Sequence, residues 1–220
     1  MSVPVTVAVK FHLVNAIGRA ILLSSLVLLG ACSVDADDGV AGIWSSASRT
    51  KGGLGSQWIF LKDGNVTYTF GALVDFKYEV IGNRIKTTFL ASDQSVTNEV
   101  SVEEFSIDGD TLTTNPHSPD RKQVMKRSGG SNTGVPSIVG DWTYTHYTGG
   151  PALMRYSRSG IVQLSVPFQT LTGTYRENQG ILSVTLRDQK PMNIKFRREK
   201  DFLILTDNEA KENKYLVFEY

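Results

Sequence analysis

Two parts of this 220-residue sequence resemble each other, and this internal repeat limits the possible folds more than any other property. A Gly-x-Trp element that ends at Trp44 recurs at Trp142. The following turn and aromatic positions recur as well, at an offset of about 90 to 98 residues. A linker rich in glycine, serine and asparagine lies between the two parts. The sequence therefore predicts two copies, residues 42–127 and 138–220, joined by a linker at residues 128–137.

Within each copy, short runs of β-branched and aromatic residues alternate with polar ones, a pattern with a period of two. Gly and Asn pairs interrupt these runs, for example at Gly64-Asn65 and Gly82-Asn83, and such pairs close tight hairpins. We therefore predict an all-β protein with two tandem antiparallel meanders of about eight short strands each. Four of the short strands expected on this basis are Val66–Phe70, Lys77–Val80, Ile161–Val166 and Leu171–Tyr175.

An apolar run near the N-terminus, Ala20–Leu29, follows a weakly basic segment and precedes small residues. This order is typical of a secretory signal peptide. The run is too short for a transmembrane helix, which needs about 20 apolar residues. We therefore expect residues 1–31 to be a signal peptide and the mature chain to be exported.

Residues 29–32 read Leu-Gly-Ala-Cys, which resembles the lipobox of bacterial lipoproteins. The resemblance implies that Cys32 becomes the first residue of the mature chain and carries its lipid, including a palmitate-like acyl chain. Ser33 follows, in place of the aspartate that retains such proteins in the inner membrane, which implies sorting to the outer membrane. Residues 32–41 then form a tether between the membrane and the folded part. Because Cys32 is the only cysteine, no disulfide is expected.

Gly-x-Trp at the start of a first strand, followed by an antiparallel meander, resembles the lipocalin-like (calycin) families. The likeness is greatest to the small lipocalin-like domains of bacterial lipoproteins. It implies barrels closed at one end by a structural tryptophan, Trp44 or Trp142, beneath a basic residue of the last strand. On this basis we expect Arg127 above Trp44 and Lys214 above Trp142. An eight-stranded barrel is either filled by its own side chains or holds one small ligand.

Patterns for catalysis or metal binding are weak in this sequence. Ser48 and Lys51 match the Ser-x-x-Lys motif of penicillin-recognising enzymes, but its companion motifs are missing and the flanking glycines predict a hairpin loop. His117 and His146 lack the spacing of metal ligands. We therefore predict a protein that is not an enzyme and that has no cofactor and no metal.

The net charge of +1 indicates no particular partner, and together with export it argues against nucleic acid. Lys195 and Arg197 are predicted to share the outer face of one strand, because Ile194 and Phe196 alternate with them. With Arg198 they form a candidate patch for anionic lipid headgroups, lipopolysaccharide or an acidic partner. The competing interpretation is a solvated strand surface that discourages pairing at a sheet edge.

Two functions are compatible with these features. The first is a lipid-anchored, non-enzymatic module of the outer membrane that faces the periplasm and binds a lipid or another small apolar ligand. The second is an envelope interaction protein with filled barrels that binds a protein partner on its outer faces or strand edges. An internal cavity favours the first function, whereas solid interiors with an exposed apolar patch favour the second.

Overall fold

The computed structural model describes residues 39–91, 95–128, 137–207 and 209–219. These residues form strands and no helix, so the prediction of an all-β chain is confirmed, and none of them belongs to a helix that could span a membrane. The strands are β1 (Gly42–Ser46), β2 (Leu54–Phe60), β3 (Asn65–Ile81), β4 (Arg84–Leu90), β5 (Val96–Asp108), β6 (Thr111–Thr114), β7 (Gln123–Ser128), β8 (Gly140–Thr145), β9 (Pro151–Tyr156), β10 (Ile161–Asn178), β11 (Ile181–Leu186), β12 (Met192–Glu199), β13 (Phe202–Thr206) and β14 (Glu212–Phe218).

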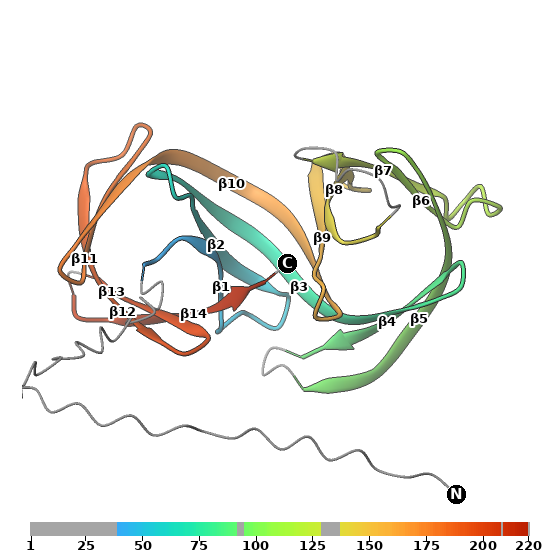
Figure 1. Cartoon of the computed structure of the whole chain (residues 1–220), viewed down its shortest axis with the longest axis horizontal. Helices are drawn as coiled ribbons and strands as arrows, with labels where there is room; N and C mark the ends of the chain where they lie inside the picture. The colour runs from blue at the N-terminus through green and yellow to red at the C-terminus, as the bar shows by residue number, and fades with distance from the viewer. Residues whose placement is uncertain (1–38, 92–94, 129–136, 208, 220) are drawn as a thin grey trace, which may run out of the picture. The chain divides into compact units, whose positions relative to one another are not determined.

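The fourteen strands of the described residues form one antiparallel sheet that closes on itself, because β14 pairs with β1. Each strand also pairs with the next one along the chain. In addition, β3 and β10 pair with each other over most of their length, from Asn65 opposite Thr174 to Lys77 opposite Ile161. Figure 1 shows these two strands side by side between two groups of shorter strands. Their pairing divides the closed sheet into two smaller rings that share β3 and β10.

We name each ring after the tryptophan in its core. The Trp44 ring consists of β1, β2, the first part of β3, the last part of β10, and β11 to β14. The Trp142 ring consists of the last part of β3, β4 to β9, and the first part of β10. Strands β1 to β7 precede the predicted linker and β8 to β14 follow it. Each ring therefore combines strands from both sides of the linker.

The two long strands replace the four short ones expected from the sequence. Val66–Phe70 and Lys77–Val80 both lie within β3, and Ile161–Val166 and Leu171–Tyr175 both lie within β10, so the prediction of a break in each was wrong. Gly71 is the physical reason in β3. It does not turn the chain; a Cβ built there would collide with the backbone carbonyl of Val166. The glycine therefore permits the close approach of the two long strands.

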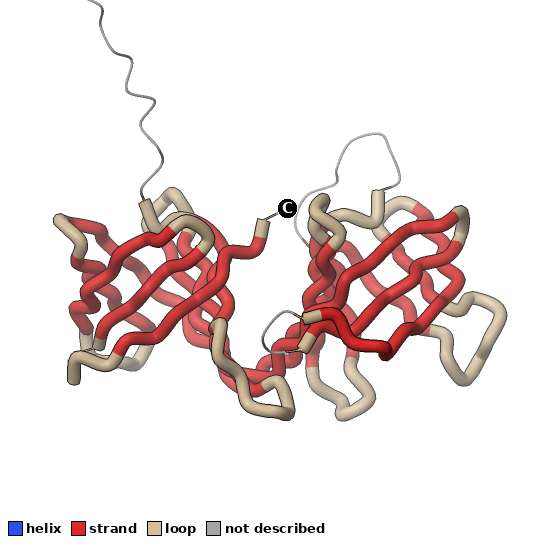
Figure 2. The backbone as a smooth tube through the Cα atoms, turned by 90° about the horizontal axis from the view of Figure 1, so that it is seen from below, coloured by secondary structure: helices blue, strands red, loops and turns tan. Residues whose placement is uncertain are grey.

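Each ring encloses its own hydrophobic core, and Trp44 and Trp142 are completely buried in them. Figure 2 shows the strands of the two rings and the loops that connect them at the ends of the rings. Burial of aromatic and aliphatic side chains supplies most of the stability of such rings. Besides Trp44, the core of the Trp44 ring contains Val40, Trp58, Phe60, Val66, Leu182, Val184, Leu186, Leu203, Leu205 and Tyr215. Besides Trp142, the core of the Trp142 ring contains Ile85, Leu112, Met125, Ile138, Tyr156 and Val162.

Candidate ligand-binding site

A cavity of about 220 Å³ lies in the Trp44 ring, at the end of the ring opposite Trp44. Its position follows from the strand order, because β1 runs from the Trp44 end to Ser46, and Ser46 pairs with Tyr215, which lines the cavity. The β13–β14 turn and the start of β12 form the rest of this end. The lining residues are Trp58, Met192, Asn193, Ile194, Leu205, Asp207, Asn213 and Tyr215.

The strand period explains why most of this lining is apolar. On β12, the half-buried Met192 and Ile194 alternate with the exposed Asn193 and Lys195. On β13, Leu205 is 4% exposed and belongs to the same core. Alternation thus directs one apolar face of each strand into the ring, while the polar residues remain at the rim of the cavity.

Trp58 is the unusual member of the lining. Its side chain stacks on Phe60, with ring centroids 5.6 Å apart, and packs at 4.6 Å against Tyr68. Its indole N–H is buried and has no hydrogen-bond acceptor among the residues that the structure describes. A buried donor without an acceptor costs about 1–3 kcal/mol, so such groups call for an explanation.

Three hydroxyl groups lie near Trp58. They belong to Ser56 on the same strand, to Tyr68 on β3 and to Tyr215 on β14. Ser56 Oγ lies 3.3 Å from the hydroxyl oxygen of Tyr215. Burial raises the pKa of the Tyr68 hydroxyl, the nearby Tyr215 raises it further, and a hydrogen bond with Ser56 lowers it in part. The uncharged form of Tyr68 is therefore favoured, and the site combines an apolar interior with a few hydroxyl groups. This composition is typical of small-molecule sites.

The opposite end of the ring is closed by Trp44. Its indole N–H donates to the backbone carbonyl of Val40 at 2.7 Å, and the guanidinium of Arg198 lies 5.2 Å from the ring centroid. Arg198 also donates to the carbonyl of Gly39 at 3.0 Å. Trp44 is completely buried here, and its role as a plug stays a prediction.

The Trp142 ring repeats this arrangement. Trp142 donates to the carbonyl of Ile138 at 2.7 Å, and the guanidinium of Arg127 lies 4.1 Å from the ring centroid. We expected Arg127 above Trp44 and Lys214 above Trp142, and both expectations were wrong. Arg127 lies near the end of β7, directly opposite Trp142 on β8. Lys214 lies instead over Phe202, at 3.9 Å.

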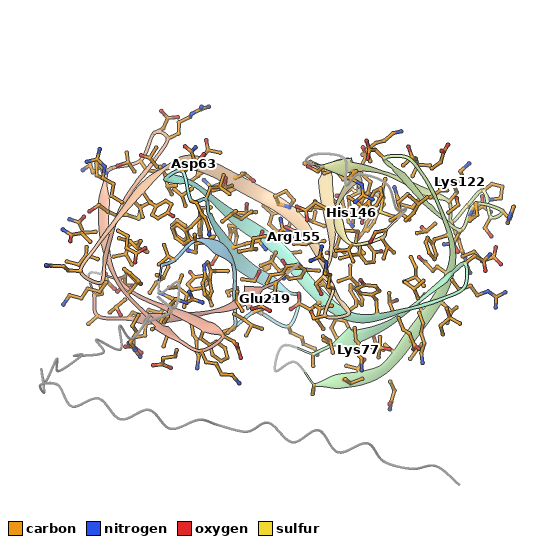
Figure 3. All side chains as sticks on the ribbon, in the orientation of Figure 1. Asp63, Lys77, Lys122, His146, Arg155 and Glu219 are labelled. Atoms are coloured by element: carbon orange, nitrogen blue, oxygen red, sulfur yellow. The ribbon has the colours of Figure 1, made fainter. Side chains whose placement is uncertain are left out.

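A buried polar network lies where the two rings meet. Arg155 on β9 donates from Nε and Nη2 to both carboxylate oxygens of Asp141, at 2.9 and 3.0 Å. Its Nη1 donates to Oε1 of Gln57 on β2, at 3.2 Å. Figure 3 shows Arg155 beside the two shared strands. This side chain, 4% exposed, thereby connects a strand of the Trp142 ring to a strand of the Trp44 ring.

The network continues through the shared strands. Gln57 Nε2 donates to Oε1 of Gln163 on β10 at 2.6 Å, and Gln163 Nε2 donates to Oδ1 of Asp75 on β3 at 2.8 Å. Asp75 then forms an ion pair with Arg49 at 2.9 Å. Because each carboxylate here faces an arginine, we interpret this network as structural. The sequence did not indicate it, since its members lie on six separate segments.

One of the three cations of the candidate basic patch, Arg197, is paired with carboxylates. Arg197 donates to both carboxylate oxygens of Glu212, at 2.6 and 3.1 Å, and to Glu199 at 3.0 Å. These bonds raise the pKa of Arg197. Arg198 lies over Trp44, and Lys195 is exposed on β12. The three cations therefore share β12 but do not present one uncompensated positive surface.

The remaining sites predicted from the sequence contribute nothing to the cavity. Ser48 and Lys51 lie in the loop between β1 and β2, as the flanking glycines predicted. The described residues contain no group of three His, Cys, Asp or Glu side chains that could hold a metal ion. The predicted lipidation site, Cys32, lies outside the described residues.

No protein-family model, no curated protein and no solved structure matches this chain. Its function is therefore argued from the geometry of the cavity. The role of Trp58 could not be anticipated from the sequence, because nothing distinguishes this residue from other alternating aromatic residues.

Proposed function

We propose that this protein is a lipid-anchored, non-enzymatic binding module of the bacterial outer membrane, facing the periplasm, and that its Trp44 ring binds a lipid or another small apolar ligand. In this proposal Cys32 carries the lipid, residues 32–41 form the tether, and each ring is a lipocalin-like barrel. The observation that carries the binding function is the apolar cavity at one end of the Trp44 ring.

The size of the cavity limits the ligand. An apolar cavity of about 150 Å³ is large enough for benzene, so one of 220 Å³ accommodates a somewhat larger molecule or the end of an acyl chain. Met192 gives the lining an adaptable side chain, because methionine has three rotatable bonds and a polarisable sulfur. This combination suits a compact apolar molecule rather than a sugar or a nucleotide.

Native mass spectrometry tests this function on the soluble chain that begins at Ser33 and is produced in a bacterial periplasm. We expect a retained small-molecule mass. The substitution Met192→Trp fills the mouth of the cavity and should abolish the retained mass. Met154→Trp is the matched control, because Met154 is a half-buried methionine packed against the other core. A bare polypeptide mass for the unsubstituted chain, together with no binding of added naphthalene-sized ligands, would overturn the proposal.

A second function, docking of an envelope protein, is favoured by a different observation on β5. Val96, Val100 and Val102 are 53–63% exposed on this strand. Over Val96–Glu104 the strand pairs only with β4 among the described strands, because β6 pairs with Phe105–Asp108. Exposed valines beside an unpaired strand edge are typical of sites where another chain adds a strand. Failure of the ligand test would make this the better candidate.

A further inference from the structure

We infer that the ligand of the Trp44 ring is an uncharged molecule that carries a hydrogen-bond acceptor, such as a ketone or ester carbonyl, attached to an apolar body. This inference rests on the proposed binding function and specifies the chemistry of the ligand. Its basis is the Trp58 N–H, a buried donor without an acceptor among the described residues, on a side chain that lines the cavity.

The other tryptophans show that this chain otherwise supplies an acceptor to each indole. Trp44 and Trp142 each donate to a backbone carbonyl four residues earlier in the chain, at 2.7 Å. Trp58 lies on β2 opposite Trp44, yet it has no equivalent bond within the part of the chain that the structure describes. An acceptor on a bound ligand would satisfy this donor, and the buried position would strengthen the bond because water does not compete there.

The surroundings of Trp58 exclude other ligand classes. Its neighbours Phe60 and Tyr68 are aromatic, and the cavity walls are Ile194, Leu205 and Met192. Among the described residues, the lining has no charged side chain in this apolar part, and its single charged residue is Asp207, in the β13–β14 turn. A carboxylate ligand would meet that negative charge and would lose its own hydration. A neutral carbonyl meets no charge repulsion, and its smaller loss of hydration is offset by the hydrogen bond from Trp58.

Access to the N–H requires a small rearrangement, because neighbouring side chains cover it. We expect a change of rotamer in a flexible lining residue such as Met192 to expose the indole edge. We therefore expect the acceptor to reach Trp58 without any movement of the strands. This expectation makes the interaction visible as a local change at one indole group.

Two probes of the same shape test the contribution of the acceptor to the affinity separately from that of the apolar body. In 2-acetylnaphthalene the side group is a carbonyl, and in 2-isopropenylnaphthalene a CH₂ group replaces the carbonyl oxygen. On the soluble chain beginning at Ser33, we expect the ketone to bind roughly five- to tenfold more tightly, as expected for one hydrogen bond to a buried donor. Trp58→Phe should remove this preference and leave the affinity for the hydrocarbon within about twofold. Trp142→Phe, in the other ring, is the control and should retain the preference.

Nuclear magnetic resonance of the indole groups gives a second readout that does not depend on the stability of a variant. The chain has three tryptophans, so three indole N–H signals are expected, and Trp58→Phe assigns one of them. The ketone should shift the Trp58 proton downfield, whereas the hydrocarbon should not, and the signals of Trp44 and Trp142 should remain in place. Equal binding of both probes, with no shift at Trp58, would overturn this inference and leave the binding function intact. Absence of binding by both probes would instead count against the binding function itself.

Discussion

Trp44 and Trp142 occupy matching positions in the two rings, but their surroundings differ. Each indole donates to a carbonyl four residues earlier, and each lies beneath an arginine. Arg127, above Trp142, has a side chain only 6% exposed and donates to two backbone carbonyls. Arg198, above Trp44, is exposed and lies 1.1 Å farther from its ring centroid, at 5.2 Å against 4.1 Å. The closed end of the Trp142 ring is thus the more completely buried of the two.

In the proposed function, the Trp142 ring has the structural role and the Trp44 ring binds the ligand. The Trp142 ring has the more buried arginine over its tryptophan, whereas the Trp44 ring has the cavity and the Trp58 donor, which has no acceptor among the described residues. Both rings share β3 and β10. We therefore expect a change in the packing of one ring to affect the other through these strands.

The largest effects are expected from removal of either plugging tryptophan. Trp142→Ala and Trp44→Ala each open a cavity in a core and should lower the free energy of unfolding by about 3–5 kcal/mol. We expect the greater loss for Trp142, because the buried Arg127 then loses its contact with the indole, whereas Arg198 over Trp44 is exposed. Urea denaturation of the soluble chain measures both. A loss below about 1 kcal/mol for either variant would show that this tryptophan does not close its ring.

The next largest effect concerns the shared strands. Gly71→Ala places a Cβ against the Val166 carbonyl and should destabilise the fold by about 1–3 kcal/mol, since the β3–β10 pair must separate locally. Gly150→Ala is the control, because a Cβ there meets nothing within 4 Å and Gly150 is not among the positive-φ glycines. If the two variants are equally stable, the close pairing of β3 and β10 is wrong. Unfolding of both rings in one transition would support it.

A smaller effect distinguishes the two arginines. Arg127→Ala should cost about 2 kcal/mol, because a desolvated cation–π contact is lost and two carbonyl groups lose their donor. Arg198→Ala should cost less than about 1 kcal/mol, since exposed contacts of this kind are weak. The same denaturation experiment measures both variants. The reverse order of these losses would contradict the difference in burial between the two closed ends.

The smallest effect is a dependence on alkaline pH that originates in the Trp142 ring. Burial raises the pKa of Tyr156, and nearby Glu103, Tyr78 and Tyr144 raise it further. An unfolded tyrosine ionises near pH 10, so the unfolded chain releases this proton first, and stability falls as the pH rises above about 10. Tyr156→Phe should reduce the loss of stability between pH 8 and about 10.5 by somewhat less than 1 kcal/mol. An unchanged pH profile would show that another group is responsible.

The local chemistry of the turns made most of the strands predictable. Gly64 and Gly82 both adopt positive φ in tight turns, at 85° and 62°, as their Gly-Asn pairs indicated. The unbroken course of β3 was not predictable, because a glycine within a strand, such as Gly71, has no local signal that separates a turn from a close approach. Arg127 shows the same limit: its charge and position near a strand end were evident, but the strand that it would pair with was not.

The sequence by itself determined the all-β class, the turn positions and the burial of Trp44 and Trp142, because these depend on residue periodicity and on the conformations that single residues allow. Only the tertiary structure decided that β3 pairs with β10, that each ring combines strands from both sides of the linker, and that Trp58 lines a cavity and has no acceptor among the described residues. These features arise from contacts between residues about a hundred positions apart. Such contacts depend on which strand edges meet, and local sequence patterns do not record that choice.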